Sequence, residues 1–457
     1  GELYNSTIQN AASIATRDNA RIRNSNITGN TSIKGTGRID DSNVYFENDL
    51  IVSDTLQNGG SLWWVNLHIK GNLTNNGFIR NNLQANQLNV EVWGNVYNNG
   101  EINIWYVYLP GQKIQYISQS VGKYFNADVR ASDASGYGYN TGSIIAASDL
   151  AFKKSVVLTG YVVGVGDQVN TIDMAGYNLF LSGEAQLYNA IIKNIASVTT
   201  LDNASVSSTT FEGDVSIKGT GRMSDSRVYF NGNVTVIDTL QNGGSLGWLT
   251  PVITGNITNY GAVKNSYLGN SLCLDIRGNI YNYGYWNIWQ TLLKTEGADR
   301  YISGTFNTSF YMYKSGTPAS GDVYVDGSLV NQNEIIFKDG VQLIIKPGSA
   351  FVNSGAIREN GTVINNGVFT STHNLEWYDK LNSGLNASME LTDRKTLENI
   401  TITYNYNAIH PLMSSSVKQW WRFTAKGEPG GYKLTLKYDT DMLNGMNPEQ
   451  LEVYISP

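Results

Sequence analysis

Short apolar stretches separated by polar turns run along almost the whole chain. Residues 88–92 alternate apolar and polar side chains, and Val228-Tyr229-Phe230 is a short apolar run of the same kind. Alternation with a period of two predicts β-strands that bury one face. Asparagine and glycine recur between these stretches, and they favour the tight or left-handed turns that end a strand. The pattern therefore predicts an all-β protein built from many short strands.

A long internal repeat organises these stretches. Residues 31–64 return as residues 215–248, and the nine residues from Asp54 to Leu62 are identical in the second copy. Position n matches position n + 184 throughout, without a gap from Leu3 to Trp105. We interpret this repeat as the tandem duplication of one ancestral block.

A shorter period lies inside each block. A Gly-Asn-apolar signature, or a close relative, begins four times per block, and the intervals between its starts are the same in both blocks. Its starting positions are Gly29, Asn48, Gly71 and Gly94, and again Gly213, Gly232, Gly255 and Gly278. Units of about 23 residues hold two or three short strands, and such units stack at ~4.8 Å into a solenoid. Asparagines at one turn position can then hydrogen-bond from unit to unit.

The two periods together predict a long parallel β-helix (β-solenoid) over about residues 1–375, with about 23 residues per turn. Block 1 spans residues 1–184 and contains a less regular segment at 106–182. Block 2 and the terminal turns span residues 185–375.

The rhythm changes after residue 375. Longer alternating runs occupy residues 400–404, 419–423, 432–438 and 451–455, and turns rich in Gly, Pro and Asn separate them. Four or five antiparallel strands of this kind make a small β-sandwich. We therefore predict a separate C-terminal domain at residues 376–457.

Two sets of motifs carry a family resemblance. Residues 420–423, 432–439, 443–445 and 451–454 resemble the β-sandwich modules near the C-termini of large secreted bacterial surface proteins. The upstream Gly-Asn-Ile-x-Asn-x-Gly phrases resemble the right-handed parallel β-helix of bacterial surface adhesins and filament-type proteins. Together they cover most of the chain, and their motifs are structural ones shared by members with many functions. The resemblance implies a secreted protein of the cell surface.

Composition and charge argue against several classes of binding partner. Charged residues make up 15% of the chain, the net charge is −6 and no basic tract is present, which argues against nucleic acid or an anionic membrane as partner. No apolar run approaches the ~18 residues of a membrane helix. Cys273 is the single cysteine, so the sequence predicts no disulfide framework and no thiolate metal site. The start at Gly1 without a methionine indicates a processed or trimmed N-terminus, and we expect an extracellular location.

Residues with catalytic chemistry are few and scattered. His68, His373 and His410 lie far apart, without the spacing of a metal site or a catalytic triad. Lyases and glycosidases of the β-helix fold need carboxylates clustered with basic groups on one face. Asp40-Asp41 is the single Asp-Asp pair, and no accompanying basic motif marks it as such a site. We expect no catalytic residue, no cofactor and no metal, and predict that the protein is not an enzyme.

Tryptophans are the strongest candidates for a binding surface. Together with many tyrosines, six tryptophans could form a surface that stacks on sugars or on another subunit: Trp63, Trp64, Trp105, Trp248, Trp286 and Trp289. Of these, Trp63, Trp64 and Trp248 are the predicted stacking residues. The alternative is that they cap the solenoid face or fill its core.

Both ends of the predicted fold are expected to expose strand edges. Residues 3–5 already match residues 187–189, which follow a preceding rung, and the predicted sandwich is short of strands. The expected edges are at Leu3, Tyr4 and Ile8, and at Leu451, Val453 and Tyr454. Two unlike edges on one molecule form a head-to-tail contact that propagates as a fibre.

Three functions follow in order of preference. The first is a non-enzymatic subunit of a cell-surface filament or sheath, joined to copies of itself by β-strand pairing or strand donation. The second is a carbohydrate-binding adhesin domain that recognises surface glycans. The third is a polysaccharide lyase or glycosidase on the β-helix fold.

Overall fold

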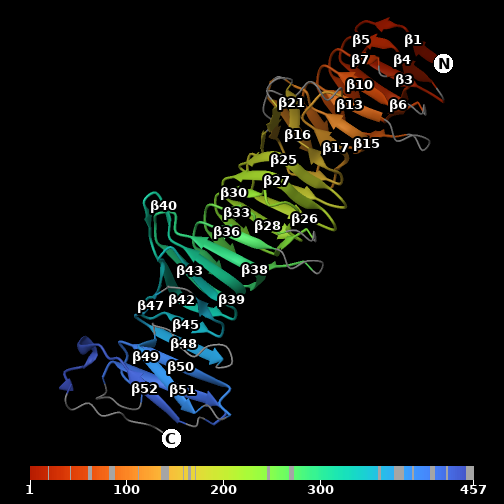
Figure 1. The fold of residues 1–457 in the computed structure, drawn as a ribbon. Coiled ribbons are helices and arrows are strands. Elements are labelled where there is room, and N and C mark those ends of the chain that lie inside the picture. The colour runs from red at the N-terminus through yellow and green to blue at the C-terminus, as the bar shows by residue number, and fades with distance from the viewer. Residues whose placement is uncertain are drawn as a thin grey trace. The chain divides into compact units, whose positions relative to one another are not determined.

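In the computed structural model of the 457-residue chain, the regular secondary structure of the described residues is almost entirely β-strand (Figure 1). The residues that it describes are 1–18, 20–41, 43–59, 64–81, 88–111, 113–134, 144–157, 159–162, 166–169, 171–243, 248–266, 272–358, 362–374, 385–393, 396–411, 417–428 and 431–448. The chain divides into two compact units, Gly1–Val252 and Ile253–Pro457.

The first unit is a parallel β-solenoid. Its first turn holds β1 (Glu2–Tyr4), β2 (Thr7–Ile8) and β3 (Ser13–Thr16), and its second holds β4 (Arg21–Arg23), β5 (Ser25–Ile27) and β6 (Thr31–Ile39). Each strand of the first turn pairs in parallel with its counterpart in the second. The prediction of an all-β parallel solenoid is confirmed.

Further strands continue this unit. They are β7 (Val44–Phe46), β8 (Leu50–Val52), β9 (Thr55–Asn58), β10 (Val65–Ile69), β11 (Leu73–Asn75), β12 (Phe78–Arg80), β13 (Leu88–Val92), β14 (Val96–Asn98), β15 (Glu101–Tyr108), β16 (Gln115–Gln119), β17 (Phe125–Arg130), β18 (Ile144–Ala146), β19 (Leu150–Phe152), β20 (Val156–Val157), β21 (Thr159–Val162), β22 (Gly166–Val169), β23 (Thr171–Asp173), β24 (Asn178–Leu181), β25 (Gln186–Lys193), β26 (Ser197–Thr200), β27 (Ser205–Glu212), β28 (Val215–Gly219), β29 (Arg222–Met223), β30 (Tyr229–Asn231), β31 (Val234–Val236), β32 (Thr239–Asn242) and β33 (Val252–Ile253).

Three parallel ladders run along the first unit. Ladder A contains β1, β4, the end of β6, β9, β12 and the start of β15. Ladder B contains β2, β5, β7, β10, β13 and the ends of β15 and β17. Ladder C contains β3, the start of β6, β8, β11, β14 and β16.

Strands of block 2 do not lie on the same ladders as their equivalents in block 1. Ladder B passes through β20 to Leu187, whose counterpart in block 1 is Leu3 on ladder A. Ladder C passes through β18 and β23 to Ile192, the counterpart of Ile8 on ladder B. Ladder A passes through β19 and β24 to β26, the counterpart of β3 on ladder C. The repeat is therefore not a whole number of turns, and equivalent residues of the two blocks lie on different ladders.

This offset arises in the segment at 106–182, where one turn of the solenoid contains more residues. The Gln119 amide donates to Ser148 Oγ on the next turn, 29 residues later. The corresponding separation is 23 residues between Asn75 and Asn98. An antiparallel hairpin of β21 and β22 also projects from this segment. The other strands of the segment nevertheless remain paired within the ladders. The predicted irregularity of residues 106–182 therefore lies in the connections between the strands.

Apolar side chains of successive turns stack inside the coil. The rings of Phe125 and Phe152 lie 5.4 Å apart, and those of Phe211 and Phe230 lie 5.1 Å apart with nearly parallel planes. All four side chains are fully buried. This stacked interior replaces the single compact core of an ordinary domain.

The second unit begins as a parallel solenoid and ends in antiparallel sheets. Its strands are β34 (Ile257–Asn259), β35 (Ala262–Lys264), β36 (Cys273–Ile276), β37 (Ile280–Asn282), β38 (Tyr285–Lys294), β39 (Arg300–Tyr313), β40 (Ser315–Gly316), β41 (Ala319–Ser320), β42 (Val323–Asn331), β43 (Ile335–Lys338), β44 (Gln342–Ile345), β45 (Ala350–Asn353), β46 (Ile357–Arg358), β47 (Thr362–Asn365), β48 (Val368–Asn374), β49 (Ala387–Asp393), β50 (Asn399–Tyr406), β51 (Gln419–Lys426) and β52 (Gly431–Leu436). A short 3₁₀ turn covers Thr440–Met442.

Strand β48 joins the two parts of the second unit. It pairs in parallel with β45 and antiparallel with β50, and β50 pairs antiparallel with β51. Strands β49 and β52 form a separate antiparallel pair. The strands expected at 400–404 and 419–423 lie within β50 and β51, whereas the one expected at 451–455 lies outside the described residues. The β-sandwich stays a prediction.

Candidate functional site

A β-bulge on β15 places two adjacent aromatic residues on the outer surface. Ile104 and Val107 point into the core, and the register with β17 shifts between Asn103 and Tyr106. A bulge sets two residues of one strand against one of its neighbour, which turns both side chains outward. Trp105 and Tyr106 are therefore both only half-buried.

These two residues form a stack with a predicted site residue. The Trp64 ring lies 4.7 Å from the Trp105 ring and 6.1 Å from the Tyr106 ring, with interplanar angles of 29° and 20°. The guanidinium of Arg130 lies 4.3 Å from the centre of the Tyr106 ring. Trp64 is 49% exposed. We call Trp64, Trp105, Tyr106 and Arg130 the Trp64 surface; Trp63 lies outside the described residues.

A polar column beside this surface unites residues that are distant in the sequence. His68 on β10 stacks on Tyr45, with ring centres 4.6 Å apart, and its Nδ1 lies 3.2 Å from Oε1 of Glu91 on β13. The register then continues from Glu91 to Tyr108 and from Tyr108 to Arg130. Sequence reasoning missed this column, although the separation of 23 residues between His68 and Glu91 is the period of the repeat.

The carboxylate of Glu91, at the centre of the column, has three hydrogen-bonding partners. Glu91 is 4% exposed, and it accepts hydrogen bonds from Trp93 Nε1 at 2.7 Å and from the Ala134 amide at 3.0 Å, in addition to the contact with His68. Burial opposes its ionisation, but the contacts with His68, Ala134 and Trp93 outweigh burial and hold the pKa of Glu91 below its usual value.

The neighbouring phenol is also held in one protonation state. Burial raises the pKa of Tyr108 to about 12. Glu91 therefore stays charged and Tyr108 neutral at physiological pH, and neither is poised near neutrality as a general acid or base usually is. The column ties the segment at Ala134 to β13.

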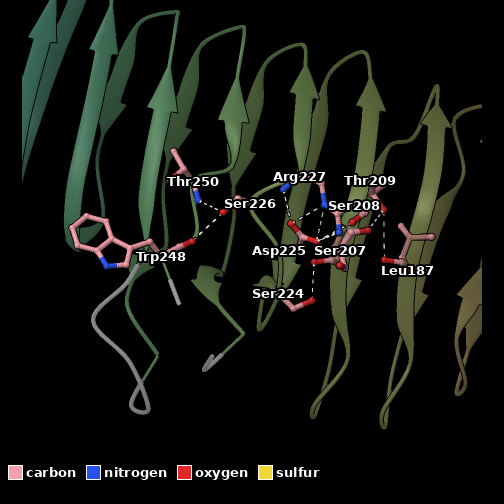
Figure 2. A network of polar contacts seen from close by, with 11 residues as sticks. Leu187, Ser207, Ser208, Thr209, Ser224, Asp225, Ser226, Arg227, Trp248 and Thr250 are labelled. Carbon is pink, nitrogen blue, oxygen red and sulfur yellow. Dashed lines mark hydrogen bonds and ion pairs between the residues drawn. The ribbon is translucent and has the colours of Figure 1, made fainter. Parts of the chain in front are cut away.

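A second polar cluster, in block 2, includes the backbone carbonyl of the other predicted tryptophan, Trp248 (Figure 2). Ser226 Oγ donates to the Trp248 carbonyl at 3.0 Å and accepts from the Thr250 amide at 3.1 Å, while the Trp248 indole points away from these contacts. Trp248 is 63% exposed. The cluster fixes the backbone that carries this exposed ring.

The same cluster contains an ion pair. Asp225 accepts from Arg227 Nη2 at 2.7 Å and from Ser208 Oγ at 2.9 Å, and all three side chains point toward one another in Figure 2. The hydrogen bond from Arg227 is the main cause that lowers the pKa of Asp225 to about 2, and burial opposes it only in part. Asp225 is therefore an anion over the whole physiological range.

The sequence of block 2 retains only some of the residues of the Trp64 surface. Trp248 and Trp289 occupy the positions of Trp64 and Trp105, and β38 has the corresponding register shift, between Asn287 and Gln290. Gln290, Leu292 and Val252 replace Tyr106, Tyr108 and His68. The aromatic and polar column is thus specific to block 1.

The predicted edge residues of the first turn lie together. Leu3 and Ile8 are half-buried and line a shallow pocket with Ile14, whereas Tyr4 is exposed. Leu451, Val453 and Tyr454 lie outside the described residues.

His410 packs edge-on against Trp420, with ring centres 5.0 Å apart. In the described ranges, no group of three or more His, Cys, Asp or Glu side chains is placed to hold a metal ion. No helix among the same residues is long and apolar enough to cross a membrane.

Comparison of the chain with protein-family models, with curated proteins and with solved structures found no match.

Proposed function

We propose that the chain is a non-enzymatic structural protein of the cell surface, a subunit of an extracellular filament or sheath. The observation that carries this proposal is that the two blocks share the contacts that build the coil. The Gly35 amide donates to Asp54 Oδ2 at 2.8 Å, and the equivalent Gly219 amide donates to Asp238 Oδ2 at 2.9 Å.

Three further pairs of contacts recur with the same offset. In the first pair, the Leu88 amide donates to Asn81 Oδ1 and the Leu272 amide donates to Asn265 Oδ1. In the second pair, the Asn95 amide donates to Asn72 Oδ1 and the Asn279 amide donates to Asn256 Oδ1. In the third pair, Asn75 Nδ2 donates to Asn98 Oδ1 and Asn259 Nδ2 donates to Asn282 Oδ1. Left-handed backbone conformations recur too, at Asn5 and Asn189, Asn10 and Asn194, Asp18 and Asp202, and Asn24 and Ser208. All of these features fix turns or connect one turn to the next.

Several outward side chains, in contrast, differ between the blocks, although the tryptophans at 64 and 105 are retained at 248 and 289. Val252 replaces His68, Arg277 replaces Trp93, and Tyr260 replaces Asn76. A repeated catalytic function would retain the outward groups that touch a substrate, whereas a repeated structural function retains the turns and the core. The comparison of the blocks therefore supports a role for the shape of the coil.

Strand edges supply a means of assembly. Among the described residues, β1, β2 and β3 each pair with one neighbour only, and β51 pairs only with β50. Backbone groups of alternate residues point to opposite sides of a strand. The carbonyls of Ser6 and Ile8 accept from the second turn, so the backbone groups of Thr7 point away from it. We propose that this edge pairs with a strand of another copy.

Sedimentation velocity over a range of concentrations tests the proposal, with variants at one position. Thr7→Pro removes an outward backbone donor, whereas Thr7→Val retains it. We expect wild type and Thr7→Val to form polymers and Thr7→Pro to remain much smaller, with an unchanged circular dichroism spectrum. Wild-type protein that stays monomeric at high concentration would contradict the filament proposal, and polymers of Thr7→Pro would contradict this edge as the contact.

A further inference from the structure

The Trp64 surface combines an exposed aromatic platform with ordered neighbours. The Trp64, Trp105 and Tyr106 rings stack with centres 4.7–6.1 Å apart, and the bulge in β15 holds two of them on a rigid strand. Aromatic side chains exposed in this way offer a large apolar area at little entropic cost, because stacking already restricts their rotation. The apolar face of a pyranose ring is a suitable partner for such a platform.

Two arginines provide positive charge beside the platform. Arg130 donates Nη2 to the Tyr106 hydroxyl at 3.3 Å, and its buried Nε has no hydrogen-bond partner. Arg80 is exposed and lies in register with Asn103, two residues before Trp105. In the part of the chain that the structure describes, neither arginine forms an ion pair. Guanidinium groups of this kind pair preferentially with carboxylates and sulfates.

Planar polar side chains complete the same area on ladder A. Arg80 Nε lies 3.4 Å from Gln57 Oε1, and Asn126 Nδ2 donates to Asn103 Oδ1 at 3.0 Å. Gln57, Arg80, Asn103 and Asn126 stand on four successive turns in register. Side-chain amides can donate to and accept from sugar hydroxyls, whereas guanidiniums can only donate to them. The exposed members of the column, Arg80 and Asn103, therefore offer hydrogen bonds to a sugar, while Gln57 is buried.

We propose that the Trp64 surface binds an acidic polysaccharide, with a sugar ring stacked on Trp64 and its carboxylates paired with Arg130 and Arg80. The two arginines favour an acidic ligand over a neutral glycan. Because the net charge of the whole chain is −6, two arginines without ion pairs beside one aromatic platform are a local concentration of positive charge. The site is independent of the edge contacts proposed for assembly, because it lies on the outer face of ladders A and B.

Block 2 provides a matched control. Trp248 is more exposed than Trp64, yet Gln290 stands where Tyr106 does in the Trp64 surface. If exposure of a tryptophan were sufficient for binding, Trp248→Ala and Trp64→Ala would have similar effects. If the assembled surface is required, only Trp64→Ala weakens binding.

Affinity electrophoresis and tryptophan fluorescence of the full chain, with alginate as a linear polyuronate and dextran as a neutral polymer, test the proposal. We expect binding to alginate that weakens with added salt, because screening reduces the arginine–carboxylate attraction. Trp64→Ala and Arg130→Gln should each weaken it at least about tenfold, Arg80→Gln about threefold, and Trp248→Ala less than about twofold.

Circular dichroism and the urea midpoint establish that each variant is folded, and Arg130→Gln provides an independent reading if Trp64→Ala alters the fold. Absence of alginate binding would overturn the proposal. Equal binding of dextran would also overturn it, because the ligand would then not be acidic. Equal losses in Trp64→Ala and Trp248→Ala would overturn the assignment to this surface.

Discussion

The side-chain amide of Asn75 donates a hydrogen bond to Oδ1 of Asn98, one turn further along the solenoid, at 2.9 Å. Both side chains are fully buried. The same Nδ2 atom also contacts the Glu101 carbonyl at 3.1 Å. The equivalent residues of block 2, Asn259 and Asn282, form the same bond at 2.7 Å. Buried amides thus connect successive turns where an ordinary core would hold only apolar groups.

Removal of this contact should destabilise the protein. Asn75→Ala leaves the buried carboxamide of Asn98 without one of its partners, which typically costs about 1–3 kcal/mol. Asn76→Ala is the matched control, because Asn76 pairs with Asn99 at 3.1 Å on the exposed side of the same turn. We expect the control to change stability by less than about 0.5 kcal/mol. Urea denaturation measures both, and equal midpoints for the two variants would contradict the role of the buried pair.

The turn at Gly35 should reject any side chain. Gly35 has φ +71°, and a Cβ atom there would lie 2.2 Å from the Thr16 carbonyl oxygen of the preceding turn. Gly35→Ala is expected to cost about 2–4 kcal/mol, because strain and a backbone clash add. Gly122 has a similar φ of +76° with no atom near its Cβ position, so Gly122→Ala should cost only about 1 kcal/mol. Thermal unfolding compares them, and a Gly35→Ala variant as stable as Gly122→Ala would show that the turns stack less closely.

Acid should weaken the ion pair at Asp225. Its pKa of about 2 in the folded chain lies below the usual ~3.9 of the unfolded chain, so its contribution is complete above about pH 4 and disappears as the pH falls toward 2. Solvent screening limits the contribution to about 1 kcal/mol or less.

Asp225→Asn should therefore lower the urea midpoint at pH 7 and match wild type near pH 2. Asp41→Asn is the control, because Asp41 occupies the same position in block 1 and Asn43 stands there in place of Arg227. A pH-independent difference between Asp225→Asn and wild type would contradict the assigned ion pair.

The single thiol should be unreactive in the folded protein. Cys273 is 2% exposed, and burial raises its pKa to about 11. At pH 8 the thiolate fraction is then about 100-fold below that of an ordinary cysteine, and access is restricted as well. We expect labelling by a disulfide reagent only after unfolding in urea. Rapid labelling of the native chain would place Cys273 on the surface.

The sequence predicts the stacking of turns but not how the two blocks are offset. The recurring Asn-Gly phrases specify strands, turns and the period, because each phrase repeats one local geometry. The shift of Leu187 from ladder A to ladder B depends on the lengths of turns within 106–182, such as the one that separates the bonded pair Gln119 and Ser148 by 29 residues. No repeat pattern marks those turns in advance.

The candidate site was predictable to a similar extent. His68 and Glu91 could have been paired from the sequence, because their separation equals the repeat period and both occupy outward positions of predicted strands. Strict alternation would have predicted that one of the two neighbours Trp105 and Tyr106 is buried. Both lie on the surface because of the bulge in β15, which alternation alone does not reveal. The antiparallel pairing of β48 with β50 likewise depends on a tertiary contact.

Electron cryomicroscopy of the purified chain at increasing concentration shows directly whether copies of the chain assemble into a filament. We expect filaments in which the first turn, β1 to β3, continues into a strand of the next copy at the ~4.8 Å spacing of paired strands. Isolated particles at every concentration, or filaments joined through other surfaces with the first turn exposed to solvent, would contradict it.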